Sequence, residues 1–202
     1  MIKHLTIITE SSKMSRHFIK YNILFTNIFN RLKKSFVCDK ILVLQERKSL
    51  MFNTTLCYIE KDGAYLMLHR IKKENDMNKD KWIGIGGKLE AGESPFDCVR
   101  REVIEETGLT LPSPHYRGII TFVSDLYGTE YMHLFSATEY TGDIKQDCNE
   151  GVLEWIKKEE LLSLPMWEGD KIFLKLLDTE KRFFSLKLVY EGDKLVSHTL
   201  EI

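Results

Sequence analysis

A helix with clear start and stop signals is the feature of this chain that most constrains its fold. We expect it over residues 95–107. Ser94 can cap its first turn, and Pro95 suits the first helical position. Asp97 lies three residues after the cap, where it can complete a capping box. Gly108 can end the helix in a left-handed conformation.

Three glutamates lie on one side of this helix. A helical residue advances by about 100°, so Glu102, Glu105 and Glu106 fall within an arc of about 100°. The adjoining stripe is apolar, through Phe96, Val99 and Val103, which places the carboxylates near the edge of the core. A merely solvated acidic face is the alternative, because each pair of like charges on an exposed helix costs only about 0.2 to 0.5 kcal/mol.

The segment before the helix is rich in glycine. Residues 84–88 read Gly-Ile-Gly-Gly-Lys, and glycine lets backbone carbonyls and amides approach a ligand closely. Clustered carboxylates with a backbone oxygen suit a hard divalent cation, above all Mg²⁺, with Mn²⁺ as a substitute. Such an ion neutralises charge on phosphoryl oxygens and acidifies an attacking water, and a neighbouring carboxylate can act as general base. The region therefore predicts metal-assisted hydrolysis of a phosphoanhydride.

The spacing of these residues matches a known pattern. Gly87 is followed by five residues, Glu93, seven residues and then the run Arg-Glu-Val-Ile-Glu-Glu-Thr-Gly-Leu at 101–109. This is similar to the Nudix box at every fixed position, and the resemblance to Nudix hydrolases extends over about residues 52–202. It implies an α+β fold, a Nudix-type α/β/α sandwich with a central mixed β-sheet, and a Mg²⁺-dependent nucleotide diphosphatase.

The resemblance also implies roles for the box residues. The metal ligands would be the Gly86 carbonyl, Glu102 and Glu106, with Glu105 nearby as ligand or base. The glutamate that takes the proton differs among Nudix enzymes. Glu150 corresponds to a further metal-side carboxylate of some relatives, and a plain surface glutamate is the alternative. The residues expected to be structural are Glu93, Arg101 and Gly108.

Within the family, the chain looks most like the hydrolases of oxidised purine nucleoside triphosphates, which release a monophosphate and pyrophosphate. The likeness rests on Lys81-Trp82, on Pro165-Met166-Trp167 with Asp170 after it, and on the closing residues 198–201. In those relatives the matching tryptophan stacks on the base and the matching acid bonds its edge. Core packing is the alternative for Trp167.

Two departures concern the base. Gly169 stands where those enzymes have the first of two successive acids, and Ile83 stands where they have an asparagine. A site that loses a hydrogen-bond partner can lose much of its selectivity, so the preference extends to another purine or is loose. The residues expected to contact the substrate are Arg70, Ile83, Gly87, Lys88, Trp167 and Asp170.

Two other functions compete with this one. Tyr127 lies at roughly the distance past the box where dinucleoside-polyphosphate hydrolases have a tyrosine, which makes those enzymes the closest enzymatic alternative. The proline that marks ADP-ribose hydrolases is absent, since Ser124 and Asp125 occupy that stretch. A non-catalytic Nudix protein that senses nucleotides is the alternative from another class. Such proteins usually lose box glutamates, and this chain retains them all.

Other elements follow from hydrophobic periodicity and turn residues. Lys61-Asp62-Gly63 predicts a hairpin turn, and residues 72–81 a polar loop. Strands are expected at 53–60, 64–69, 116–124, 130–138, 152–156, 183–190 and 195–202. Further helices are expected after Lys157 and over about 167–178.

Composition indicates a soluble cytoplasmic enzyme. No apolar run approaches the roughly 20 residues of a membrane helix, so no membrane partner is expected. The four cysteines stand far apart, which favours reduced thiols. A nucleotide is the expected partner, and no nucleic-acid site is evident in the acidic residues 51–202. The sequence carries no signal of oligomeric state.

Residues 1–50 differ from the rest. They hold ten Lys and Arg against three Asp and Glu, whereas residues 51–202 hold 19 against 27. Apolar residues between Phe18 and Leu32 can form one amphipathic helix, which fits a membrane-surface or targeting segment. The alternatives are a poorly packed extension, or translated upstream sequence before a physiological start at Met51. We expect residues 1–50 to be a basic extension outside the catalytic fold, and residues 51–202 to be the Nudix hydrolase domain.

Overall fold

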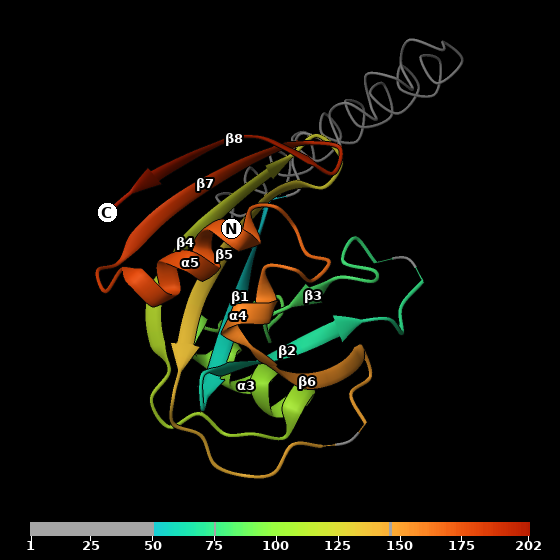
Figure 1. Ribbon diagram of the computed structural model, residues 1–202, viewed down its shortest axis with the longest axis vertical. Coiled ribbons are helices and arrows are strands. Elements are labelled where there is room, and N and C mark those ends of the chain that lie inside the picture. The colour runs from blue at the N-terminus through green and yellow to red at the C-terminus, as the bar shows by residue number, and fades with distance from the viewer. Residues whose placement is uncertain (1–50, 75, 146) are drawn as a thin grey trace, which may run out of the picture. The chain divides into compact units, whose positions relative to one another are not determined.

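The computed structural model describes residues 51–74, 76–145 and 147–202 (Figure 1). The predicted basic extension and its amphipathic segment lie outside the described residues. The strands are β1 (Met51–Lys61), β2 (Ala64–Arg70), β3 (Trp82–Ile83), β4 (His115–Ser124), β5 (Gly128–Ala137), β6 (Gly151–Lys157), β7 (Phe184–Glu191) and β8 (Lys194–Glu201). The helices are α3 (Pro95–Thr107), α4 (Lys158–Leu161) and α5 (Asp170–Thr179). None of the helices in the described part of the chain is both long and apolar enough to span a bilayer.

The strands form one mixed sheet. Its order is β3-β2-β1-β5-β4-β7-β8, with β6 paired to β2 (Figure 1). β1 runs parallel to β5, and β4 runs parallel to β7, whereas the other pairs are antiparallel. The hairpin turn predicted at Lys61-Asp62-Gly63 is present, with positive φ at Asp62 and Gly63.

Each face of the sheet is covered by a helix. Successive side chains of a strand point to opposite faces, and in β1 Cys57 and Ile59 pack in one core cluster with Val99 and Val103 of α3. The alternate residues Leu56 and Tyr58 pack in a second cluster that includes Phe173 of α5. The arrangement is the α/β/α sandwich that the sequence predicts.

The ends of α3 are set by its capping residues. The Ser94 hydroxyl accepts a hydrogen bond from the Asp97 backbone N–H at 3.2 Å, and the Asp97 carboxylate accepts one from the Ser94 N–H at 3.0 Å. At the other end Gly108 has φ +78°, and its N–H donates to the Ile104 carbonyl at 2.9 Å. The predicted bounds of this helix are therefore confirmed.

The late helix begins later than the sequence predicts. α5 starts at Asp170 and not near Trp167. The Asp170 N–H bonds the Trp167 carbonyl at 3.1 Å, which closes a turn over these residues before the helix starts. Trp167 consequently lies in a turn, and its side chain is not on a helical face.

The capping box of α3 can be tested by removing its hydroxyl. We expect Ser94→Ala to lower the free energy of unfolding by about 1 kcal/mol, because one helix N–H loses its acceptor. Urea denaturation measures the change. Ser197→Ala, on the exposed side of β8, is the matched control and should change stability by less than about 0.5 kcal/mol. Equal effects of the two substitutions would contradict the assignment.

Candidate active site

A cavity of about 640 Å³ brings the predicted site residues together. It is lined by parts of β1, α3, β4 and β5, by the glycine-rich segment at 84–88, and by the turn that precedes α5. The predicted residues on its lining are Arg70, Ile83, Gly86, Gly87, Lys88, Glu102, Glu106, Glu150, Trp167 and Asp170. Glu105 is not on the lining, and neither are Glu93, Arg101 and Gly108.

The glycine-rich segment lies directly against β1. The Thr55 N–H donates to the Gly87 carbonyl at 2.8 Å, and the Cys57 N–H donates to the Ile85 carbonyl at 2.7 Å. A Cβ on Gly86 would lie 2.0 Å from the Thr55 carbonyl oxygen, so only glycine fits between the two backbones. This contact fixes where the Gly86 N–H and carbonyl point.

Glu106 is a buried carboxylate beside that segment. Its side chain accepts a hydrogen bond from the Gly86 N–H at 3.1 Å, and the residue is only 6% exposed. No Lys or Arg of the described chain forms an ion pair with it. Burial raises the pKa of Glu106 to about 7, the Gly86 hydrogen bond opposes the rise, and the Glu102 charge adds to it. The charges of Arg70 and Lys73 also oppose the rise, so Glu106 is a buried carboxyl group with cations nearby but without a direct ion pair.

Glu102 approaches the same segment one turn earlier on α3. A Cβ added to Gly87 would lie 2.4 Å from the Glu102 Oε1 atom, so the carboxylate packs directly on the Gly87 backbone. Glu102 and Glu106 thus reach the glycine-rich segment from one face of the helix. Glu105 does not: its side chain is 59% exposed, and its carboxylate bonds Arg101.

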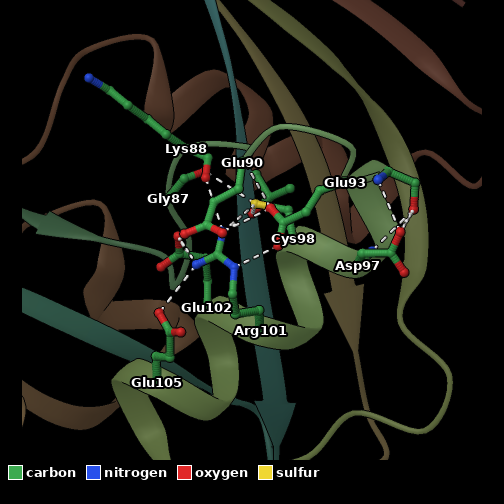
Figure 2. Close-up of polar contacts among 11 residues, drawn as sticks. Gly87, Lys88, Glu90, Glu93, Asp97, Cys98, Arg101, Glu102 and Glu105 are labelled. Atoms are coloured by element: carbon green, nitrogen blue, oxygen red, sulfur yellow. Dashed lines mark hydrogen bonds and ion pairs between the residues drawn. The ribbon is translucent and has the colours of Figure 1, made fainter.

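Arg101 joins the glycine-rich segment to α3 (Figure 2). Its Nε and Nη2 atoms donate to the two carboxylate oxygens of Glu93 at 2.6 and 2.9 Å. Nη1 donates to Glu102 at 2.8 Å and Glu105 at 3.2 Å, and Nη2 also donates to the Lys88 carbonyl at 3.1 Å. The Arg101 guanidinium holds the pKa of Glu93 down at about 2. Glu93 and Arg101 lie where they can orient loop and helix.

Two cations bind the carboxylate of Glu150 on the cavity lining. Its carboxylate forms ion pairs with Arg70 and with Lys73. Arg70 is also bonded to Asp76, with 2.6 Å between Nη2 and Oδ2. Glu150 lines the cavity, yet both of its oxygens are engaged by these cations. Arg70 likewise reaches the cavity already paired with two carboxylates.

The donor set at the glycine-rich segment fits a hard cation. Within residues 51–74, 76–145 and 147–202, no three His, Cys, Asp or Glu side chains lie close enough to form a ready metal cage. Two carboxylates, Glu102 and Glu106, stand beside the Gly86 backbone, and Glu106 lacks a charged partner. Mg²⁺ is usually bound through one or two carboxylates, waters and substrate phosphates, so this partial oxygen set suits it.

The other end of the cavity is aromatic. Trp167 is 6% exposed and makes edge contacts with Phe122 and Tyr190, at ring-centroid distances of 5.7 and 5.2 Å. Its Nε1–H donates to the Asn78 side chain at 2.8 Å. The Lys81 ammonium lies 4.4 Å from the Trp167 ring centroid. Lys81 does not line the cavity, so it contacts the ring from outside. Trp167 serves both core packing and the cavity wall.

Asp170 is the acid of this aromatic end. It is 7% exposed, and no described residue hydrogen-bonds its carboxyl group. Burial raises its pKa to about 8, with a smaller contribution from the Glu130 charge and an opposing one from Lys81. An unpartnered carboxyl facing a cavity is available to a ligand.

Comparison with known proteins agrees with the box. A sequence model described as the NUDIX domain matches residues 52–177. The chain belongs to the Nudix family. The Uncharacterized Nudix hydrolase YvcI of Bacillus subtilis is 35% identical over 120 residues, which cover 57% of this chain and 72% of that protein. The Oxidized purine nucleoside triphosphate hydrolase of Danio rerio is 33% identical over 132 residues, covering 64% and 83%.

Solved structures extend the likeness to the fold. The mutator MutT protein from Bacillus halodurans superposes with a TM-score of 0.66 at 34% identity, covering 74% of this chain and 97% of that one. The protein is therefore a Nudix hydrolase with an α+β Nudix fold. The matched residues 52–177 include the glycine-rich segment, the box glutamates, Trp167 and Asp170.

Several residues of this Nudix cavity were missed by sequence reasoning. Those on its lining are Phe52, Thr54, Thr55, Leu56, Lys73, Asp76, Met77, Asn78, Phe122, Glu130 and Met132. A signal was present for some of them. Glu130 and Met132 alternate with buried Leu134 on one face of β5, so period-two alternation directs them toward the same interior.

The pKa of Asp170 predicts a pH-dependent stability. The folded pKa of Asp170, about 8, exceeds the unfolded value of 3.8. The stability that protonated Asp170 contributes is therefore fully present below the unfolded pKa and is lost as the pH rises through about 8. Asp170→Asn should therefore raise the free energy of unfolding above wild type at alkaline pH, by roughly 1.4 kcal/mol per pKa unit removed. Denaturation measured across this pH range tests it.

The control is Asp193→Asn, which changes an exposed aspartate in the turn between β7 and β8. Its stability difference from wild type should stay constant with pH. An Asp170→Asn difference that is equally flat would show that the buried carboxyl does not titrate as its surroundings dictate.

Proposed function

We propose that this Nudix hydrolase uses Mg²⁺ to cleave a phosphoanhydride of purine nucleoside triphosphates, oxidised ones included, and releases a monophosphate and pyrophosphate. One observation carries the proposal: a single cavity is lined at one end by Glu102 and Glu106 and at the other by Trp167 and Asp170. A substrate with a polyphosphate and a flat base matches these two ends. The names of the Danio rerio and Mus musculus relatives support the same class, since both are oxidized purine nucleoside triphosphate hydrolases.

At the carboxylate end, the Gly86 carbonyl, Glu102 and Glu106 would hold the ion. Nudix hydrolases generally use divalent metal ions such as Mg²⁺. When bound, the ion supplies neutralisation of phosphoryl charge and a more acidic water. Burial raises the pKa of Glu106 to about 7, and a bound cation would oppose this rise by stabilising the ionised carboxylate. Glu105 is exposed and bonded to Arg101, so it has to leave that partner before it can serve as ligand or base.

Basic residues on the lining would receive the phosphates. Lys88 projects over the Phe52 ring, with Nζ 4.8 Å from its centroid, between the glycine-rich segment and β1. Arg70 and Lys73 also line the cavity, where both are paired with Glu150. Phosphate oxygens compete with carboxylates for such cations. Glu150 would then be released toward the metal end, which is the role expected of it by family resemblance.

At the aromatic end, the base would contact Trp167 and Phe122, with Asp170 at its edge and Ile83 as an apolar neighbour. Base stacking on an aromatic side chain is worth about 1 to 3 kcal/mol. Gly169 contributes no polar group, since a Cβ there would lie 2.4 Å from the Leu188 Cδ1 atom. The edge of the base is therefore met by fewer acids from this turn than in the oxidised-purine relatives.

A dinucleoside polyphosphate is the second candidate substrate. Tyr127 lines the cavity and packs edge-on against Trp167, with ring centroids 6.3 Å apart. Two aromatic side chains at one end of the cavity are compatible with a second base. The non-catalytic alternative is weakened by the complete set of box glutamates and by the position of Glu102 and Glu106 on the cavity lining.

A substrate screen with Mg²⁺ decides between these functions. The panel is 8-oxo-dGTP, dGTP, dATP, ADP-ribose and a dinucleoside tetraphosphate, with products identified by chromatography. We expect the purine triphosphates to give monophosphate and pyrophosphate, and chelation of the metal to abolish turnover. Cleavage of the dinucleoside tetraphosphate alone would overturn the triphosphate proposal, and binding without any cleavage would favour a nucleotide sensor.

Replacing the buried carboxylate tests the metal end. Glu106→Gln keeps the size of the side chain and its hydrogen bond from Gly86, but it removes the negative charge. We expect kcat/KM with Mg²⁺ to fall by roughly 100-fold or more, since a ligand to the ion is lost. Glu154→Gln, on the exposed side of β6, should retain wild-type turnover. Unchanged turnover in Glu106→Gln would remove this residue from the catalytic assignment.

A further inference from the structure

One acid on the cavity wall belongs neither to the Nudix box nor to the resemblance with oxidised-purine hydrolases. We propose that Glu130, at the start of β5, determines base specificity by accepting a hydrogen bond from an N–H group of the purine, and that Thr54 positions it. This inference rests on the proposed function and specifies how the same site selects its substrate.

The strand register places Glu130 beside the aromatic end. It pairs with Phe52 of β1 and with Phe122 of β4. Directly opposed residues of neighbouring strands have side chains on one face, with Cβ atoms about 5 Å apart. Phe122 in turn contacts the Trp167 ring at 5.7 Å. Glu130 is thus one strand away from the aromatic wall on which a base would lie.

A buried hydroxyl holds the Glu130 carboxyl in place. The Thr54 Oγ1–H donates to its Oε1 atom at 2.7 Å, and Thr54 is only 7% exposed. No described residue donates to Oε2, and no described Lys or Arg forms an ion pair with the group. Glu130 lines the cavity, so its second oxygen is available to a ligand. Without such a ligand, only one of the two oxygens of this partly buried carboxyl group is hydrogen-bonded.

Elimination among the acids of the cavity leaves two for the base. Asp76 and Glu150 are paired with Arg70, and Glu102 and Glu106 stand at the glycine-rich segment. The remaining acids on the lining are Glu130 and Asp170. They come from β5 and from the start of α5, which are different walls of one cavity.

Electrostatics show that these two acids share one environment. Burial raises the pKa of both carboxyl groups, and the Glu130 charge contributes to the rise at Asp170. A carboxyl in this setting has a strong preference for a ligand donor, since an unpaired buried acceptor costs about 1 to 3 kcal/mol. Phosphate would be repelled by such a group. A base N–H satisfies it.

Glu130 also compensates for the absence of an acid at Gly169. In this chain a Cβ at position 169 would displace the Leu188 side chain and the Tyr190 hydroxyl, since it would lie 2.4 and 2.8 Å from them. The acid that is missing from the turn before α5 is replaced in function by one that enters from β5. Glu130 and Asp170 then contact the edge of the base from two walls of the cavity. The set of base N–H groups that the site accepts therefore differs from that of a site with two successive acids.

The test is a binding series with the metal-free protein and deoxynucleoside monophosphates. The probes are 8-oxo-dGMP, dGMP, dIMP and the monophosphate of purine deoxyriboside, whose base has no N–H. Glu130→Gln keeps an acceptor for Thr54, but its amide presents N–H in place of the second carboxyl oxygen. We expect Kd to rise about 10-fold or more for the N–H-bearing bases and to stay within about 2-fold for the donor-free base.

Two further variants make the result specific. Thr54→Val removes the hydroxyl that holds the carboxyl, so it should give a smaller loss with the same ranking of bases. Glu154→Gln, which changes an exposed acid of β6, should leave every Kd at its wild-type value. A probe for which wild type and Glu130→Gln have the same Kd lacks the recognised N–H group. Comparison of the probes therefore identifies that group.

Three outcomes would overturn the inference. One is an equal loss for all four bases, which would indicate general damage to the cavity. Another, with GMP and IMP as added probes, is an effect that distinguishes ribonucleotides from deoxyribonucleotides and not the bases from one another, which would assign Glu130 to the sugar. The third is a wild-type protein that binds no purine monophosphate at millimolar concentration.

Hydrolysis is measured separately, so that the two proposals fail independently. If wild type shows the predicted base ranking but hydrolyses no purine triphosphate with Mg²⁺, the proposed reaction fails and the role of Glu130 stands. If the triphosphates are hydrolysed and Glu130→Gln has no base-dependent effect, only the inference fails.

Discussion

The close contact between Gly86 and the Thr55 carbonyl is the constraint on which the candidate site depends. No side chain fits at Gly86, and the hydrogen bonds of Thr55 and Cys57 fix the segment along β1. β2 pairs with β1 only where the hairpin closes, from Ile59 to Lys61, which leaves the preceding part of β1 open to this segment. A backbone amide is thereby aimed at Glu106. The sheet, and not the loop alone, sets the geometry of the carboxylate end.

The two faces of the sheet contribute different halves of the cavity. α3 packs on one face through Val99 and Val103 and carries Glu102 and Glu106 at its edge. The turn before α5 belongs to the other face and supplies the aromatic wall and Asp170. Because each half is anchored in its own core cluster, substitutions at one end need not disturb the other. This separation lets one catalytic arrangement serve different bases.

The sequence predicted what is determined locally. The bounds of α3 follow from its capping residues, and the box glutamates follow from spacing along one helix. The helical arc alone did not predict that Glu105 points away from Glu102 and Glu106. Its carboxylate instead binds the Arg101 guanidinium, four residues earlier on the helix. Trp167 was placed in a helix because the turn closed by Asp170 has no strong residue signal. Glu130 lies on β5, and its neighbours Phe52 and Phe122 are remote in sequence, so only strand pairing brings them together.

The carboxyl groups of the cavity differ in whether a cation is paired with them. Glu150 is paired with Arg70 and Lys73, and Asp76 is paired with Arg70. The carboxyl groups without a cation, at Glu106, Glu130 and Asp170, all have raised pKa values because of burial, so protonation relieves part of the cost of desolvation. A ligand that supplies a cation at one end and hydrogen-bond donors at the other relieves that cost without protonation. The cavity is therefore least stable in the ligand-free, fully ionised state, and this difference favours a nucleotide that arrives with its metal ion.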